Sequence, residues 1–141
     1  MLVLSAEDVT VCLSMETAIE GMHHAYAACT SGDAEMPLRT VIPLSASPNL
    51  AIFMPVHIKD SSEVALKSVM FSPNNERLGL PAIQATVQVF DAATGTPVAL
   101  IDGSELTAIR TAAGGGASME LLAREESHSL AMLGSGTQAR A

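Results

Sequence analysis

The sequence contains few aromatic residues and no tryptophan, so its core must be built from smaller side chains. Of the 141 residues, 48% are hydrophobic but only 3% are aromatic, and eight are methionine. The interior is therefore expected to consist mainly of Ala, Val, Leu, Ile and Met. The length suits one ordinary domain with a hydrophobic core of its own.

Basic residues are scarce as well. Seven Lys and Arg stand against 15 Asp and Glu, which gives a formal net charge of −8 at pH 7. A protein that binds nucleic acid needs a basic surface to neutralise the phosphates. This charge balance therefore argues against a nucleic-acid partner.

Paired cysteines and long apolar runs are also missing. Cys12 and Cys29 are isolated and lack C-x-x-C spacing, so we expect two small buried hydrophobic residues, with a disulfide as the alternative. No apolar run approaches the roughly 18 residues of a membrane span. Residues 1–8 lack the basic region and the apolar stretch of a signal peptide. The expectation is a soluble, cytoplasmic protein with no membrane partner.

The N-terminal part predicts two helices. Ser5 can cap a short helix, with Glu7 and Asp8 in its first turn. Ser14 can cap a longer amphipathic helix, which Gly32 ends. The apolar stripe of this second helix follows i, i+3, i+4 spacing and comprises Met15, Ala18, Ile19, Met22, Ala25, Tyr26 and Cys29.

The middle of the chain predicts a mostly antiparallel sheet. Runs rich in Val, Ile, Leu and Phe are separated by Pro, Asn and Gly, and they occupy residues 38–44, 50–58, 64–71 and 83–90. Residues 73–75 form a turn, and residues 91–95 connect the last run to 98–101 as a hairpin. Short connections between successive strands favour antiparallel pairing.

A second helix-forming region begins at an N-cap formed by residues 102–104 and extends to about residue 124. Its apolar stripe comprises Leu106, Ile109, Ala113, Ala117 and Leu121. Three consecutive glycines at 114–116 cost about 1 kcal/mol each relative to alanine in a helix. Either the helix breaks there, or another backbone or a ligand approaches it closely.

The last segment reads as a buried strand followed by a glycine turn. Residues 128–133 are the predicted strand, and Gly134, Gly136 and Ala139 form a G-x-G-x-x-A pattern. In a dinucleotide-binding βαβ unit such a turn brings the backbone close to a pyrophosphate. The unit needs more than about 30 residues and an acidic residue about 20 positions further on, so only its beginning is present here.

Lys67 stands in the middle of a predicted strand. Strand alternation places it on one face with Ala65, Val69 and Phe71. Such a lysine lies either on a solvated sheet edge or in a pocket. Burial would lower its pKa, and it could then transfer a proton or bind a carboxylate.

Arg110 belongs to a polar stripe with an unusual composition. The stripe runs beside the apolar one and consists of Thr107, Arg110, Thr111, Gly114 and Ser118. Hydroxyls, a glycine and one guanidinium suit a carboxylate or phosphate ligand, whereas a solvated face is the alternative. Arg39, on the first predicted strand, could bind a substrate carboxylate, and an ordinary exposed arginine is equally compatible with its position.

The sequence contains no metal-binding pattern and no common nucleophile motif. His23 and His24 are adjacent and diverge by about 100° on a helix, so they cannot face one ligand. His57 and Asp60 lack metal-ligand spacing as well. No metal is expected, and G-x-S-x-G, P-loop and H-E-x-x-H patterns are absent from the sequence.

Taken together in order, several stretches resemble the ornithine cyclodeaminase and mu-crystallin family. They are Met54-Pro55, Lys67 on its strand, Leu80-Pro81, residues 91–97, residues 101–113 and residues 133–139. The resemblance covers the whole chain but only the N-terminal part of a family member, which is normally more than twice as long. It implies an α/β fold in which residues 1–125 form a substrate-binding and dimerisation domain of α+β type. Residues 126–141 then begin a truncated Rossmann domain that binds NAD or NADP.

The resemblance also implies an activity and an assembly. Family members are homodimers whose N-terminal sheets pack together, and they convert small amino acids with NAD or NADP. Ornithine cyclodeaminase, which forms proline and ammonia through an imine, is the activity expected first. The alternatives are a ketimine reductase or alanine dehydrogenase, a mu-crystallin-like binding protein, and a non-catalytic dimerisation fragment. The 141-residue chain alone is expected to be inactive, and its strand 128–133 to favour association.

Site residues follow from the resemblance by position. Lys67 corresponds to a lysine that binds the substrate carboxylate and handles a proton, and Arg39 to a second carboxylate partner. Arg110 corresponds to an arginine beside both substrate and cofactor, with Thr111 next to it. The expected cofactor contacts in the glycine turn are Gly134, Gly136, Thr137 and Gln138. Ala82 departs from the family pattern, because a hydroxyl residue often follows the Leu-Pro pair.

Overall fold

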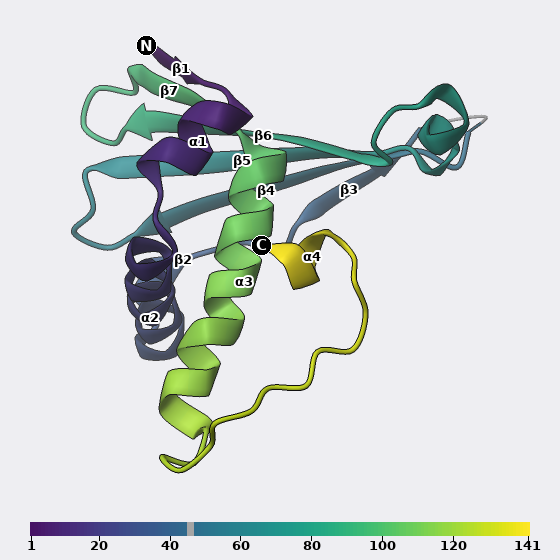
Figure 1. Ribbon diagram of the computed structural model, residues 1–141. Coiled ribbons are helices and arrows are strands. Elements are labelled where there is room, and N and C mark those ends of the chain that lie inside the picture. The colour runs from purple at the N-terminus through teal and green to yellow at the C-terminus, as the bar shows by residue number, and fades with distance from the viewer. Residues whose placement is uncertain (45–46) are drawn as a thin grey trace.

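The computed structural model describes residues 1–44 and 47–141, and it shows helices packed on one side of a single sheet (Figure 1). The sheet has the strand order β1-β7-β6-β5-β4-β2, and β3 also pairs with β4. The strands are β1 (Leu2–Leu4), β2 (Ala34–Glu35), β3 (Thr40–Pro43), β4 (Leu50–Ile58), β5 (Glu63–Phe71), β6 (Ile83–Asp91) and β7 (Pro97–Asp102). The helices are α1 (Ala6–Cys12), α2 (Met15–Ser31), η1 (Pro73–Leu78), α3 (Gly103–Leu122) and α4 (Thr137–Arg140).

The predicted antiparallel sheet is confirmed. Strands β4 to β7 pair in sequence order, each antiparallel to the next, and β3 pairs antiparallel with β4. Strand β1 is an addition that the sequence did not predict, and it pairs parallel with β7. Its three residues are too few to show an alternating pattern, and its partner lies almost 100 residues further along the chain.

Both predicted N-terminal helices begin where their capping residues indicate. The Ser5 side chain accepts a hydrogen bond from the Asp8 amide, and the Asp8 carboxylate accepts one in return from the Ser5 amide. The Ser14 hydroxyl accepts a bond from the Thr17 amide at the start of α2. Gly32 ends α2 in the left-handed conformation, with a φ of 82°.

The core is small and lies between the helices and one face of the sheet. Its buried members are Val9, Ala18, Ile109 and Ala113, and Leu4, Ile101 and Leu106 are among the residues that pack around them. Helix α3 lies across this face beside α1 and α2 (Figure 1). The predicted core of small aliphatic residues is thus confirmed.

Helix α3 continues through its three glycines without a break. A Cβ on Gly114 would lie 2.7 Å from the Tyr26 hydroxyl, and one on Gly116 would lie 2.8 Å from Ile19 Cδ1. Gly115 would meet nothing within 4 Å. Close approach was one of the two expected explanations, but the approaching groups are side chains of α2 rather than a backbone or a ligand.

Two expectations were wrong. Residues 128–133 form no strand, and Leu130, Met132 and Leu133 are 66%, 59% and 99% exposed. In the described part of the chain no strand pairs with this segment, and a single strand cannot form a ladder. Cys12 and Cys29 are exposed rather than buried, because both lie on the outward sides of their helices.

The opposite face of the sheet carries no helix among residues 1–44 and 47–141 (Figure 1). By strand register, the large apolar side chains on this open face include Val3, Ile42, Phe53, Leu66, Met70, Phe90 and Leu100.

Within residues 1–44 and 47–141, no helix has the length and hydropathy that crossing a membrane would require.

Candidate functional site

Lys67 lies in the middle of β5 and points to the face of the sheet that the helices cover. Its neighbours across the sheet are Met54 on β4 and Val87 on β6. The expected face, shared with Ala65 and Val69, is confirmed by this register. A solvated sheet edge is excluded, since β5 is an interior strand and Lys67 is half-buried under α3. Lys67 does not line either of the surface depressions described below.

Thr107 on α3 is the hydrogen-bond partner of Lys67. The Lys67 ammonium donates to Thr107 Oγ1, and the Thr107 hydroxyl donates its proton to the carbonyl of Gly103. The three residues form a short chain of hydrogen bonds from the sheet to the first turn of the helix. Thr107 belongs to the polar stripe that the sequence predicted, and the structure shows that this stripe partly faces the sheet.

The first turn of α3 is fixed on strand β6. A Cβ on Gly103 would lie 2.8 Å from the carbonyl carbon of Ala85 and 2.9 Å from the Thr86 nitrogen, so only glycine fits here. The Ser104 hydroxyl accepts a bond of 3.1 Å from the Ala85 amide. Asp102 caps the helix by accepting a bond of 2.8 Å from the Glu105 amide. The contact at Gly103 was missed at the sequence level, where residues 102–104 predicted only a cap.

Arg110 adds a second positive charge beside Lys67. Burial lowers the pKa of the Lys67 ammonium below its ordinary value of 10.5, and the charge on Arg110 lowers it further. Neither cation forms an ion pair with a carboxylate in the part of the chain that the structure describes. Two neighbouring cations without a protein anion form a site suited to an anionic ligand.

The expectation that Arg39 lies on a strand was wrong, because β3 begins at Thr40 and Arg39 lies exposed in an interruption of the sheet edge. Strand β2 pairs with β4 up to His57, and β3 resumes the pairing at Phe53, so residues 36–39 pass Met54, Pro55 and Val56 without pairing. Pro55 has no N–H to contribute to a ladder, and the interruption falls at this residue.

The glycine turn does not reach this group of cations. Gly134 has a φ of 105°, which glycine adopts readily, and Gly136 precedes the short helix α4. Thr137 borders a depression on α3 together with Glu105 and Ala108, on a different side of the helix from Thr107. Gln138 lies in α4 and Thr111 in α3, and no described hydrogen bond joins either of them to Lys67 or Arg110.

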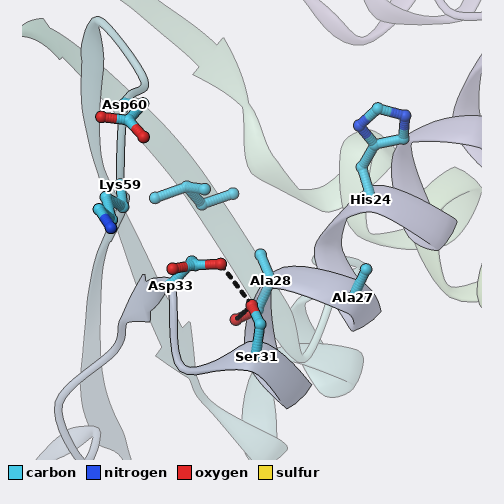
Figure 2. Close-up of a pocket in the computed structure, with 8 residues that line it drawn as sticks. His24, Ala27, Ala28, Ser31, Asp33, Lys59 and Asp60 are labelled. Carbon is cyan, nitrogen blue, oxygen red and sulfur yellow. Dashed lines mark hydrogen bonds between the residues drawn. The ribbon is translucent and has the colours of Figure 1, made fainter.

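A surface depression lies elsewhere, between the end of α2 and the turn that joins β4 to β5 (Figure 2). Its polar residues include His24 and Lys59, and its Ser31 hydroxyl donates to Asp33 at 2.5 Å. None of the residues that the sequence selected for chemistry lines it. No group of three potential metal ligands occurs within the described ranges.

Known proteins resemble the chain along almost its whole length. The profile of the ornithine cyclodeaminase/mu-crystallin family matches residues 1–141. A Delta(1)-pyrroline-2-carboxylate reductase of Bacillus cereus is 34% identical over 140 residues, which are 99% of this chain and 43% of that protein.

Two solved structures share the fold. The Thermococcus litoralis Delta(1)-pyrroline-2-carboxylate reductase, in complex with NADH and L-proline, matches with a TM-score of 0.89 and 37% identity, over 99% of this chain and 43% of that one. An archaeal alanine dehydrogenase dimer with bound NAD matches with a TM-score of 0.90 and 31% identity, over 99% and 42%. The chain thus spans less than half the length of each of these proteins.

Proposed function

Because this chain belongs to the ornithine cyclodeaminase/mu-crystallin family, we propose that it is the substrate-binding part of an NAD(P)-dependent enzyme that reduces a small α-imino acid. Delta(1)-pyrroline-2-carboxylate, the substrate named for the Bacillus relative, is the proposed substrate, with L-proline as the product. Residues 1–125 carry the substrate site in this proposal, and residues 126–141 begin the cofactor domain.

The observation that carries the proposal is that Lys67 and Arg110 are two neighbouring cations, and neither has a carboxylate partner among the described residues. Burial is the main cause of the lowered pKa of Lys67, and the charge on Arg110 lowers it further. A substrate carboxylate bound between them would supply the missing anion. Arg39, at the interrupted sheet edge, would be a second partner for the same carboxylate.

Lys67 is also suited to proton transfer. An imine nitrogen must gain a proton when its carbon is reduced, and a lysine with a lowered pKa donates a proton more readily than an ordinary one. Thr107 holds the Lys67 nitrogen in place during this step. Gly134, Gly136, Thr137 and Gln138 would hold the cofactor pyrophosphate, since Gly134 adopts the left-handed backbone of a tight turn. The bound NADH or NADPH supplies the hydride.

The surroundings of Lys67 favour a substrate with an apolar side chain over a substrate with a second amine. The nearest residues that share its face on β4, β5 and β6 include Ile52, Met54, Val69 and Val87. These four offer no strong hydrogen-bond acceptor to a second substrate ammonium, and the nearby charge on Arg110 is positive. We therefore place imino-acid reduction first and ornithine cyclodeamination, which the sequence suggested first, second. The second reaction stays a candidate because the matching family profile bears its name.

The open sheet face is the proposed dimer interface. Its apolar side chains are only partly covered, for example Ile42 and Met70, which are 45% and 41% exposed. A large exposed apolar surface of this kind is typical of an obligate interface. The dimeric state of the similar alanine dehydrogenase supports a homodimer here.

Lysine-selective NMR tests the substrate proposal. The chain has only two lysines, so labelling with [13Cε]lysine gives one signal for Lys67 and one for the exposed Lys59. We expect L-proline to shift the Lys67 signal while the Lys59 signal stays constant. Arg110→Gln should weaken this response several-fold, and the matched surface variant Arg77→Gln should not.

The outcomes of the titration distinguish between the candidate functions. A Lys67 signal that responds to neither L-proline nor L-ornithine would refute an amino-acid site at this position. A stronger response to L-ornithine than to L-proline would favour the cyclodeaminase. The corresponding assay follows NADH or NADPH oxidation with Delta(1)-pyrroline-2-carboxylate, where Lys67→Met should abolish any turnover.

A further inference from the structure

The Thr107 hydroxyl both donates and accepts a hydrogen bond. It has one proton, which it donates to the Gly103 carbonyl one helical turn back. Its oxygen lone pairs are therefore left for a donor, and Lys67 is that donor. A threonine hydroxyl can rotate, but the bond to Gly103 holds this one in the orientation in which it accepts from the lysine.

We propose that Thr107 is a positioning residue that fixes the Lys67 nitrogen through the hydrogen-bond chain Lys67–Thr107–Gly103. One N–H of Lys67 points to Thr107, so the other hydrogens are directed away from Thr107. This inference rests on the proposed role of Lys67 at the substrate. It adds that the geometry of the lysine depends on a residue that does not itself touch the reacting atoms.

The helical bond alone would not carry this inference, because threonines in helices often bond the carbonyl four residues back. Thr30 does so with Tyr26 at 2.9 Å, and Thr10 does so with Ala6 at 3.0 Å. Thr107 differs from them because it also receives a bond from a half-buried ammonium. Thr30 therefore provides a matched control, since it makes the same backbone bond without a lysine partner.

The position of Thr107 is fixed through the start of α3. Gly103 contacts the β6 backbone so closely that a Cβ would not fit, and Ser104 bonds Ala85 on the same strand. Thr107 follows Gly103 by four residues, about one helical turn, and so faces the sheet at the level of Lys67. The sheet and the helix together determine where the lysine nitrogen lies.

The test is a pH titration of the two lysine signals in the chain without any ligand. Thr107→Val keeps the side-chain shape but removes the acceptor, so the charged form of Lys67 loses a hydrogen bond. We expect the Lys67 pKa in Thr107→Val to fall below the wild-type value by roughly half to one pH unit. Thr107→Ser should restore the wild-type titration. Lys59 should titrate alike in all variants, and Thr30→Val should change neither lysine.

Two results would overturn the proposal. One is a Thr107→Val titration equal to the wild type, and the other is a serine variant that behaves like the valine variant. If the valine variant does not fold, a measurement on the wild type still tests the contact between Lys67 and Thr107. The Lys67 ε-protons should show a nuclear Overhauser effect to the Thr107 methyl group, and its absence would equally contradict the contact. Because no ligand is present, a failed substrate proposal would leave these results unchanged.

Discussion

The hydroxyl of Tyr26 on α2 occupies the space beside Gly114 on α3, where a Cβ would lie only 2.7 Å from its oxygen. Ile19, two turns earlier on α2, stands in the same relation to Gly116. The glycines thus allow two helices to pack at short range. The loss of helix propensity at three positions is offset by this packing, on which the covered face of the sheet depends.

Gly114→Ala should therefore destabilise the fold by up to about 1 kcal/mol, since the new methyl group displaces the end of the half-exposed Tyr26 side chain. Gly115→Ala is the matched control, because nothing lies within 4 Å of its Cβ position. The control should stabilise α3 by about 0.5–1 kcal/mol. Urea unfolding followed by circular dichroism measures both effects. Tyr26→Phe should restore most of the stability of Gly114→Ala, and a double variant as unstable as the single one would contradict the assignment.

Arg110→Gln should raise the pKa of Lys67, because it removes the charge that disfavours protonation. At pH 8 a smaller fraction of Lys67 is then uncharged, so acetylation of Lys67 should slow by roughly twofold or more. The ratio of modified Lys67 to modified Lys59, read by mass spectrometry, corrects for reagent and exposure time. An unchanged ratio would show that the two charges do not interact.

Replacement of Lys67 by methionine should change how stability depends on pH. The pKa of Lys67 is lowered in the folded state, so between that value and 10.5 the unfolded chain binds more protons. The contribution of Lys67 to stability therefore rises with pH across this window. Lys67→Met should remove that slope and be the more stable protein at pH 7, by up to about 1 kcal/mol for a half-solvated group.

The measurement for this prediction is urea unfolding at pH 7 and at pH 10. Lys59→Met serves as the control, since Lys59 is exposed and its variant should keep the wild-type difference between the two pH values. A Lys67→Met protein that is less stable than the wild type at pH 7 would indicate that the ammonium stabilises the fold, contrary to expectation.

A charge on the open sheet face should prevent the proposed dimer. Leu66 lies in the centre of this face, on the interior strand β5. Leu66→Lys should shift the molecule toward the monomer, because an unpaired charge would be buried at the interface. Val11→Lys is the control, since Val11 is 80% exposed on the helical side. Sedimentation velocity distinguishes the two states, and a Leu66→Lys dimer as tight as the wild type would place the interface elsewhere.

Local sequence patterns predicted the parts of the fold whose hydrogen bonds are local or follow in chain order. Strand β4 has the predicted bounds, and Ser5, Ser14 and Gly32 mark the helix ends as expected. Segment 128–133 has an equally apolar pattern, yet it forms no strand. Hydrophobicity indicates that a segment can be buried as a strand. A hydrogen-bonded ladder also needs a partner strand, which the hydrophobic pattern does not predict.

The candidate site was predictable only in part. The alternation of side chains along the strand correctly predicted which residues share a face of the sheet with Lys67, because a strand has a period of two. Its burial and its bond to Thr107 were not predictable, since these residues are 40 positions apart and their contact depends on the docking of α3. That docking depends on Gly103, where the missing Cβ allows backbone contact with Ala85. A glycine in a cap motif gives no indication in sequence of the strand it will meet.

At the interruption between β2 and β3, the position of Arg39 does not depend on the strand pairing that holds the sheet together. Residues 36–39 make no ladder bonds, while β4 behind them is held along its other edge by continuous pairing with β5 from Val64 to Phe71. An insertion or deletion at 36–39 would therefore move Arg39 without breaking the sheet. If Arg39 contacts substrate as proposed, the range of substrates can change at little cost in stability, and relatives with different substrates should differ in length at this segment.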